Sequence, residues 1–170
     1  MEGLDYHEIF SPVVKLVSIC IVLALVALLD LELEQLDVKT YFLHGDLDGT
    51  TRRFCTTLES RLVCKLKKSL YGLKQSPRKW YMMLDSFMVS QGYTRSEYDH
   101  CLYFKRFEDI FIIYVLYVDD ILIVSKIMDE INRLKAQMAR TFDMKDLGVA
   151  KQILGIEIHR DKKNGKLSFS

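Results

Sequence analysis

Apolar and polar positions along the chain predict three helices. From Val17 to about Leu31 the residues are apolar nearly all round, so we expect a helix that is covered on most sides. Ser76 followed by Pro77 is typical of a helix start, and Gly92 is typical of a helix end. A third helix is expected from Met128 to Phe142. The second helix has an apolar stripe at helical spacing, formed by Trp80, Leu84, Phe87 and Met88.

Runs rich in β-branched and aromatic residues predict the strands of a sheet. The first, from Leu33 to Phe42, carries Asp37 between apolar neighbours. Near the C-terminus, strands at Gln152–Ile158 and from Leu167 onward flank Asn164-Gly165, a pair typical of a type I′ hairpin turn. No element can be assigned between residues 48 and 61. The central strands are expected at Cys101–Arg106, Ile110–Tyr117 and Ile121–Ser125.

The order helix, strand, helix, strands, helix, hairpin predicts an α+β fold, an antiparallel sheet with helices packed on one face. A chain of 170 residues has room for one sizeable core. The longest apolar run, Leu16 to Leu29, is shorter than the ~20 residues of a membrane-spanning helix, so we expect no membrane association. A buried helix is the preferred interpretation of this run, and the core of a signal peptide is the alternative.

The cysteines and histidines do not predict a zinc site. The four cysteines include no C-x-x-C pair, and the four histidines are scattered along the chain. The spacing is not that of a disulfide framework, and the N-terminus does not resemble a secretory signal. We therefore expect reduced thiols in an intracellular protein.

A formal net charge of +1 conceals a basic segment in the middle of the chain. From Arg61 to Tyr81 there are seven Lys and Arg residues and no acid, interleaved with Leu, Tyr and Trp. Such a stretch suits a nucleic-acid backbone, although a solvated protein face is the alternative. The candidate nucleic-acid-binding residues are Lys65, Lys67, Lys68, Lys74 and Arg78.

Asp119 and Asp120 stand at the expected tip of a hairpin between two apolar runs. One interpretation is a wet turn, because Asp tolerates turn geometry. The other is a cation site, in which Asp37 on an adjacent strand would supply a third carboxylate. Mg²⁺ prefers a few carboxylates together with substrate phosphate oxygens, and two ions could clamp both reacting oxygens of a phosphoryl transfer.

Four blocks stand in order along the chain: QLDVKTYFLHGDL at 35–47, VCKLKKSLYGLKQSPRKWY at 63–81, YVDDILIVS at 117–125 and MKDLGVAKQILGIEIHR at 144–160. In order and spacing these blocks resemble the reverse transcriptase of copia-type LTR retrotransposons. The resemblance runs from about Tyr6 to the last residue, apart from the stretch after Asp48. It implies one partial reverse transcriptase domain over residues 1–170, a polymerase palm with fingers and thumb incomplete.

The resemblance also implies an activity and a set of site residues. The activity is magnesium-dependent addition of deoxynucleotides to a primer 3′-hydroxyl on an RNA or DNA template, with Mn²⁺ as a substitute ion. Asp37, Asp119 and Asp120 would be the catalytic carboxylates that bind two ions. The hairpin at Leu154–Ile158 would grip the primer. The implied substrate-binding residues are Phe42, which would exclude a ribose 2′-hydroxyl, and Tyr71, Gly72 and Gln75, which would lie along the nucleotide and template.

Other features leave alternatives open. Lys145 could lie near the leaving phosphates or be a plain surface lysine. Tyr41 stands where the family usually has Ala, Cys20 replaces a usual arginine, and residues 48–61 diverge or are shortened. We therefore expect no primer extension by this chain alone. The alternative to a polymerase fragment is an inactive relic with a nucleic-acid-binding palm fold.

Another palm-like phosphotransferase, such as a nucleotide cyclase, would share the carboxylates but would not explain SLYGLKQSP. For a member of the copia-type family, the resemblance implies a cytoplasmic particle or the nucleus as the location. The sequence does not predict an oligomeric state.

Overall fold

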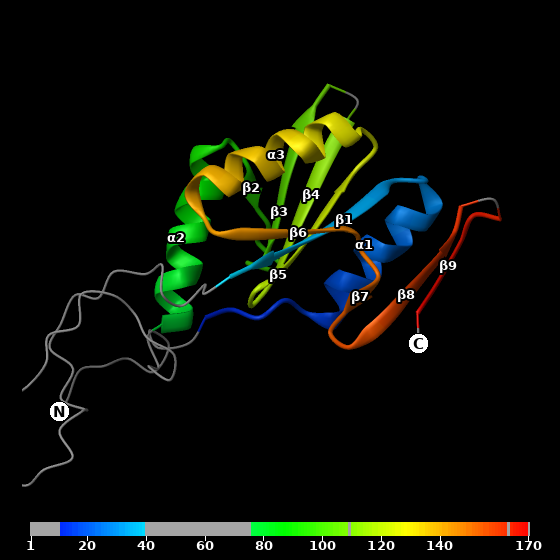
Figure 1. Cartoon of the computed structure of the whole chain (residues 1–170), viewed down its shortest axis with the longest axis horizontal. Helices are drawn as coiled ribbons and strands as arrows, with labels where there is room; N and C mark the ends of the chain where they lie inside the picture. The colour runs from blue at the N-terminus through cyan, green and yellow to red at the C-terminus, as the bar shows by residue number, and fades with distance from the viewer. Residues whose placement is uncertain (1–10, 40–75, 109, 163, 170) are drawn as a thin grey trace, which may run out of the picture. The chain divides into compact units, whose positions relative to one another are not determined.

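The computed structural model describes residues 11–39, 76–108, 110–162 and 164–169 (Figure 1). The chain divides into two compact units, one of residues 12–39 and 85–170, the other of residues 1–11 and 40–84. The helices are α1 (Leu16–Leu28), α2 (Ser76–Ser90) and α3 (Met128–Thr141). The strands are β1 (Glu32–Val38), β2 (Thr94–Arg95), β3 (Leu102–Phe107), β4 (Ile110–Tyr117), β5 (Asp120–Ser125), β6 (Met144–Val149), β7 (Gln152–Ile153), β8 (Ile156–Asp161) and β9 (Lys166–Phe169).

The larger unit is built on a six-stranded antiparallel sheet with the order β2-β3-β4-β5-β1-β6. The long apolar runs form its centre, because β4 and β5 are buried along nearly their whole length. The expected central strands are confirmed to within one residue at each end. The strand that carries Asp37 begins one residue before the expected Leu33, but it ends at Val38 rather than Phe42, because the chain turns at Lys39. Strands β2 and β6 were not expected from the pattern, since β2 has two residues and β6 is mostly exposed.

Cross-strand register shows which face of this sheet the helices cover. Directly paired residues of antiparallel strands point to the same face. Tyr103, Tyr114, Ile123 and Glu34 are such partners in series from β3 to β1. The hydroxyl of Tyr103 donates to the Asp85 carboxylate of α2 at 2.8 Å, and Lys135 of α3 contacts Glu34. The C-terminal part of α2 and α3 therefore share one face, and the α+β class is confirmed.

Helix α3 follows its predicted pattern closely. Its acidic first turn and its basic last turn, with Arg140, suit the helix dipole. The apolar stripe of Ile131, Leu134 and Met138 is buried. The ring of Phe142, which follows the helix, packs edge-on against Phe87 of α2, with 5.2 Å between the centroids.

Helix α1 corrects the expectation of all-round burial. One side of the helix is buried, but Val17, Ile21 and Leu28 are more than half exposed. The physical reason is that a single helix docked on one surface buries one side only, whatever the composition of the other side. The helix ends at Leu28 rather than Leu31, because the chain turns at Asp30, whose φ is 48°. None of the described helices is long and apolar enough to cross a membrane.

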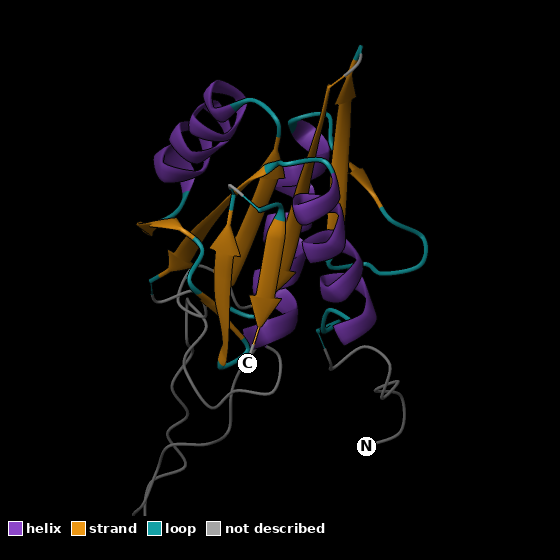
Figure 2. Cartoon of the chain, turned by 90° about the vertical axis from the view of Figure 1, so that its right-hand side faces the viewer, coloured by secondary structure: helices purple, strands orange, loops and turns teal. Residues whose placement is uncertain are grey.

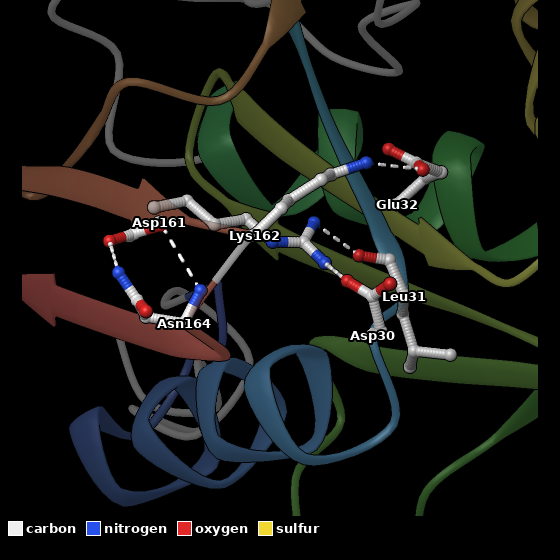
Figure 3. Close-up of polar contacts among 7 residues, drawn as sticks. Asp30, Leu31, Glu32, Asp161, Lys162 and Asn164 are labelled. Atoms are coloured by element: carbon white, nitrogen blue, oxygen red, sulfur yellow. Dashed lines mark hydrogen bonds and ion pairs between the residues drawn. The ribbon is translucent and has the colours of Figure 1, made fainter.

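The C-terminal strands form a second, three-stranded sheet with the order β7-β8-β9, which faces the viewer in Figure 2. Polar contacts tie β8 and the residue after it to the start of β1 (Figure 3). The Arg160 guanidinium donates to the Leu31 carbonyl and to Asp30, and the Lys162 ammonium lies 2.5 Å from Glu32. The three strands β7, β8 and β9 form a C-terminal ribbon, which is therefore held against the strand that carries Asp37.

The hairpin between β8 and β9 is confirmed, but the predicted turn type is wrong. The last cross-strand pair is Asp161 with Lys166, so four residues connect the strands. A type I′ turn needs positive φ at both central residues, and of the predicted pair only Gly165 has it, at 61°. The amide side chain of Asn164 instead donates to Asp161 at 2.6 Å, which favours the wider loop.

Candidate active site

Strands β1 and β5 bring together carboxylates that lie far apart in the sequence. Asp37, near the end of β1, is the direct cross-strand partner of Asp120, the first residue of β5. Their side chains therefore point to the same face of the sheet. This is the face opposite the one that α2 and α3 cover, because residues alternate along β1 and Glu34 lies on the helix side.

Asp119 belongs to the two-residue turn that joins β4 to β5. The turn begins at Val118, a β-branched residue with a φ of 56°, which is an uncommon and costly conformation. The amide of Val38 on β1 donates to the Asp119 carbonyl at 3.0 Å and so fixes the turn against the neighbouring strand. The turn thus holds Asp119 beside the facing pair Asp37 and Asp120.

A glutamine holds one of these carboxylates in place. The side-chain amide of Gln35 donates to Asp120 Oδ1 at 2.9 Å. Burial raises the pKa of Asp120, the bond from Gln35 opposes this, and the negative charges of Asp119 and Asp37 raise it further, with a net increase. The three acids therefore concentrate negative charge at this end of the sheet, which a cation would relieve.

A lysine completes this end of the sheet. Strand β6 pairs with the other edge of β1, and Lys145 is the direct partner of Asp37. Asp37 is thus flanked by Asp120 on one side and by Lys145 on the other, all three on the same face. Lys145 is exposed, so its ammonium is available to an anionic ligand at this end of the sheet.

The residues present suit magnesium in their donor chemistry. Carboxylate oxygens are hard ligands, and Mg²⁺ typically takes one or two of them and fills its other positions with water and substrate phosphates. In the described part of the chain no group of three His, Cys, Asp or Glu side chains is already arranged as a metal site. Asp37 and Asp120, with Asp119 adjacent, therefore fit an ion that depends on further oxygens from a ligand.

The other predicted site residues are distributed unevenly. Of these, Arg78 lies in α2, where it is half-buried, in the smaller unit. The expected primer-gripping hairpin corresponds to the β7–β8 turn, where Leu154 and Gly155 both have positive φ. Outside the described residues lie Tyr41, Phe42, Lys65, Lys67, Lys68, Tyr71, Gly72, Lys74 and Gln75, together with the divergent stretch at 48–61.

A groove of about 780 Å³ lies on the C-terminal ribbon, and neither Asp37 nor Asp120 lines it. Its lining includes Lys151, His159, Arg160 and Lys166. His159 lies 3.2 Å from Glu157 in the same groove. This mixed charge distinguishes the groove from the acidic end of β1 and β5.

Two features of the site were missed in the sequence. Gln35 is a buried polar residue on β1, two positions before Asp37, which in a strand is the spacing of residues on one face. Glu34, Lys135 and Asp146 form a polar cluster behind the site. The two polar positions of β1 between apolar neighbours were the available signal, but their partners on α3 and β6 could not be read from the chain.

Comparison with known proteins decides the family. The family described as reverse transcriptase (RNA-dependent DNA polymerase) matches residues 1–170, the whole chain. This chain belongs to the reverse transcriptase family. The sequence-based assignment to the copia-type reverse transcriptases is thereby confirmed.

Its relatives are transposon proteins of plants and yeast. It is 55% identical to the retrovirus-related Pol polyprotein from transposon TNT 1-94 of Nicotiana tabacum, over 99% of this chain and 13% of the relative. Identity to the corresponding polyprotein from transposon RE1 of Arabidopsis thaliana is 36%, over 93% of this chain and 11% of the relative. A putative transposon Ty5-1 protein of Saccharomyces cerevisiae is 31% identical, over 79% of this chain and 45% of the relative. No solved structure matches.

Proposed function

We propose that this chain provides the catalytic centre of RNA-directed DNA synthesis, the magnesium-dependent transfer of a deoxynucleotide to a primer 3′-hydroxyl. The observation that carries the proposal is the register of β1 and β5, in which Asp37 faces Asp120 directly and Asp119 follows in the adjoining turn. Membership of the reverse transcriptase family supports the same chemistry. The chain spans 13% of its tobacco relative, so the activity of the whole polyprotein extends beyond these residues.

Each residue of the site has a distinct part in the proposal. Asp37, Asp119 and Asp120 would hold Mg²⁺, which would stabilise the charge of the reacting oxygens. Gln35 keeps Asp120 in one orientation through its 2.9 Å bond. Preorganised ligands of this kind need no rearrangement during the reaction, and that lowers the barrier.

Lys145 supplies the positive charge of the site. A deoxynucleoside triphosphate is strongly anionic, and three carboxylates alone would repel it. An exposed lysine in register with Asp37 attracts the phosphates on the same face of the sheet. Of the two interpretations of this residue, the geometry favours the one near the phosphates.

The proposed partners are an RNA or DNA template-primer and deoxynucleoside triphosphates. The basic segment at 61–81 is the proposed contact for the nucleic-acid backbone, and the β7–β8 turn the proposed contact for the primer. Phosphate contacts release counterions, so affinity for a template-primer should fall with salt, log K by ~0.7 to 0.9 per contacted phosphate per log unit. A protein of this kind acts inside the cell, in a cytoplasmic particle or the nucleus.

Primer extension tests the proposal most cleanly in two settings. The chain alone should give no extension, because Tyr41 stands where the family usually has Ala. Misplacement of the triphosphate by about 1 Å costs on the order of a hundredfold in rate. The second protein replaces the matching segment of the tobacco relative with this chain carrying Tyr41→Ala. This chimera should extend a primer with Mg²⁺, and Asp119→Asn in the chimera should abolish extension.

The relic alternative is decided by the same assay. A folded chimera that binds template-primer but shows no extension would identify an inactive relic that retains the nucleic-acid-binding fold. Extension by the chain alone that disappears in Asp119→Asn would instead establish a minimal active palm. Extension that persists in Asp119→Asn would remove the carboxylate site from the mechanism.

A further inference from the structure

An irregularity in strand β6 determines which side chain faces Asp37. On one side of it Gln35 pairs with Gly148, and on the other side Leu36 pairs with Asp146. Leu147 is therefore an extra residue, a β-bulge, and Gly148 beside it has a φ of 70°. Continued without the bulge, the register would put an acid, Asp146, opposite Asp37.

The bulge thus reverses the sign of the charge at the site. A slip of one residue moves every side chain of a strand to the other face. With the bulge, Lys145 lies on the face of Asp37, and Asp146 lies on the face of α3. Without it, a fourth carboxylate would join the three acids, and the lysine would point toward the helix.

Lys135 of α3 holds this arrangement from behind. Its ammonium donates to Glu34 Oε2 on β1 and to Asp146 Oδ1 on β6, each at 2.7 Å. The same oxygen of Asp146 accepts the amide of Gly148 at 2.9 Å. The side chains of Lys135 and Glu34 are only 10% and 3% exposed, so little water competes for these bonds. One buried cation therefore connects the helix, the strand of Asp37 and the bulge.

We propose that Lys135 is a positioning residue, which through Glu34 and Asp146 fixes the bulged register of β6 and so keeps Lys145, rather than an acid, opposite Asp37. This inference deepens the proposed function, since a lysine at that place is useful to a site that takes a triphosphate. It concerns a residue on the far face of the sheet that contacts neither metal nor nucleotide.

The register is measured by NMR on the full chain, without ligand. In the wild type, cross-strand NOEs should connect Asp37 with Lys145. In Lys135→Met these NOEs should be lost, and the amides of Lys145 to Gly148 should gain motion in ¹⁵N relaxation. Lys135→Arg should restore both. Arg133→Met, which removes an exposed positive charge from the same helix, is the matched control and should change neither the NOEs nor the relaxation.

A second variant covers the case that Lys135→Met does not fold. Asp146→Ala removes the bulge contact from a side chain that is 57% exposed, so the fold tolerates it, and the same NOEs should be lost. A folded Lys135→Met or Asp146→Ala protein that keeps the Asp37–Lys145 NOEs would overturn the inference.

Binding of dTTP with Mg²⁺ then separates positioning from a merely structural role. Lys145→Met and Lys135→Met should each weaken dTTP affinity about 10-fold, and the double variant no further, because they act through one contact. Affinity for Mn²⁺ alone should not fall, since the three acids are intact and the loss of a positive charge beside them favours a cation. Additive losses would overturn the positioning role. Absence of dTTP binding by the wild type would overturn the proposed function instead, while the NOEs still decide the register.

Discussion

Acidic residues on the two faces of strand β1 have opposite kinds of partner. On the helix face, Glu34 is buried and bonded to Lys135, which also bonds Asp146. On the opposite face, the Asp37 face, Asp37 lies three positions along and is paired with another carboxylate, Asp120. Burial opposes the charge of Lys135, but its bonds to Asp146 and Glu34 raise its pKa overall, whereas the pKa of Asp120 is raised because its charge is unfavourable.

This difference separates a structural cluster from a candidate binding site. Charges buried away from water are normally compensated within the protein. The helix face follows that rule. On the Asp37 face, by contrast, the described residues that moderate the acids are Gln35 and the exposed Lys145. Uncompensated charge at a fixed place is what a site for a cation requires.

The largest expected effect comes from removing the buried cation of the helix face. Lys135→Met should lower the free energy of unfolding by about 3–5 kcal/mol, because it leaves Glu34 buried without its cation. Urea denaturation followed by circular dichroism measures this. Arg133→Met, which breaks an exposed pair on the same helix, should cost less than about 1 kcal/mol. Equal losses in the two variants would show that the cluster is not buried as described.

On the Asp37 face the main effect should be on metal binding rather than folding. Asp37→Asn and Asp120→Asn should each weaken Mn²⁺ affinity by at least about 10-fold, since even outer partners of a metal contribute 10–100-fold. Titration followed by electron paramagnetic resonance of free Mn²⁺ gives the dissociation constants. Asp129→Asn, an exposed acid in the first turn of α3, is the control and should leave the affinity unchanged. Similar losses in all three variants would indicate a diffuse charge effect.

The fold was largely predictable, because local pattern determines much of it. Strand β4 runs from Ile110 to Tyr117 as its apolar run predicts, and α2 ends at Ser90, close to the end expected at Gly92. Pattern also suggested that Asp37 could join the acids of the Asp119 hairpin. It could not predict β6, whose residues are mostly exposed and whose pairing depends on β1, a strand more than 100 residues earlier.

Of the candidate site, only the three acids were predictable from the sequence. Gln35, Lys135 and the bulge at Leu147 depend on register and on contacts between distant elements, which no local period records. The same is true of the β8–β9 turn, where an Asn-Gly pair predicted a tight turn and a wider loop formed. Local signals therefore identified the chemistry, and tertiary pairing determined how it is arranged.

As pH is lowered, cation binding at the Asp37 face should weaken at a higher pH than at an ordinary aspartate site. The pKa of Asp120 is raised, so this carboxyl takes up a proton at a higher pH than the usual 3.8. Mn²⁺ affinity of the wild type should therefore begin to fall above that value as pH decreases. Asp120→Asn should remove this part of the pH dependence. A wild-type profile that matches the variant would contradict the coupling of the three acids.

The smallest expected effect is on stability, and its sign is informative. A raised folded-state pKa means that ionised Asp120 disfavours folding above that pKa, and the effect vanishes below the unfolded value of about 3.8. Asp120→Asn keeps the acceptor for Gln35 and should raise the midpoint of thermal unfolding at pH 7. Because the group is partly exposed, the gain should be less than about 1 kcal/mol and should disappear toward pH 3. Destabilisation at pH 7 would contradict the account.

The most direct test of the Asp37 face as the cation site is a map of Mn²⁺-induced broadening of amide signals in the full chain. The account predicts that sub-stoichiometric Mn²⁺ first broadens the signals of Asp37, Val118 to Asp120 and Lys145, and that Asp37→Asn together with Asp120→Asn abolishes this. Broadening that appears first around Glu157 to Asp161 in the ribbon groove, or that survives the double substitution, would contradict it.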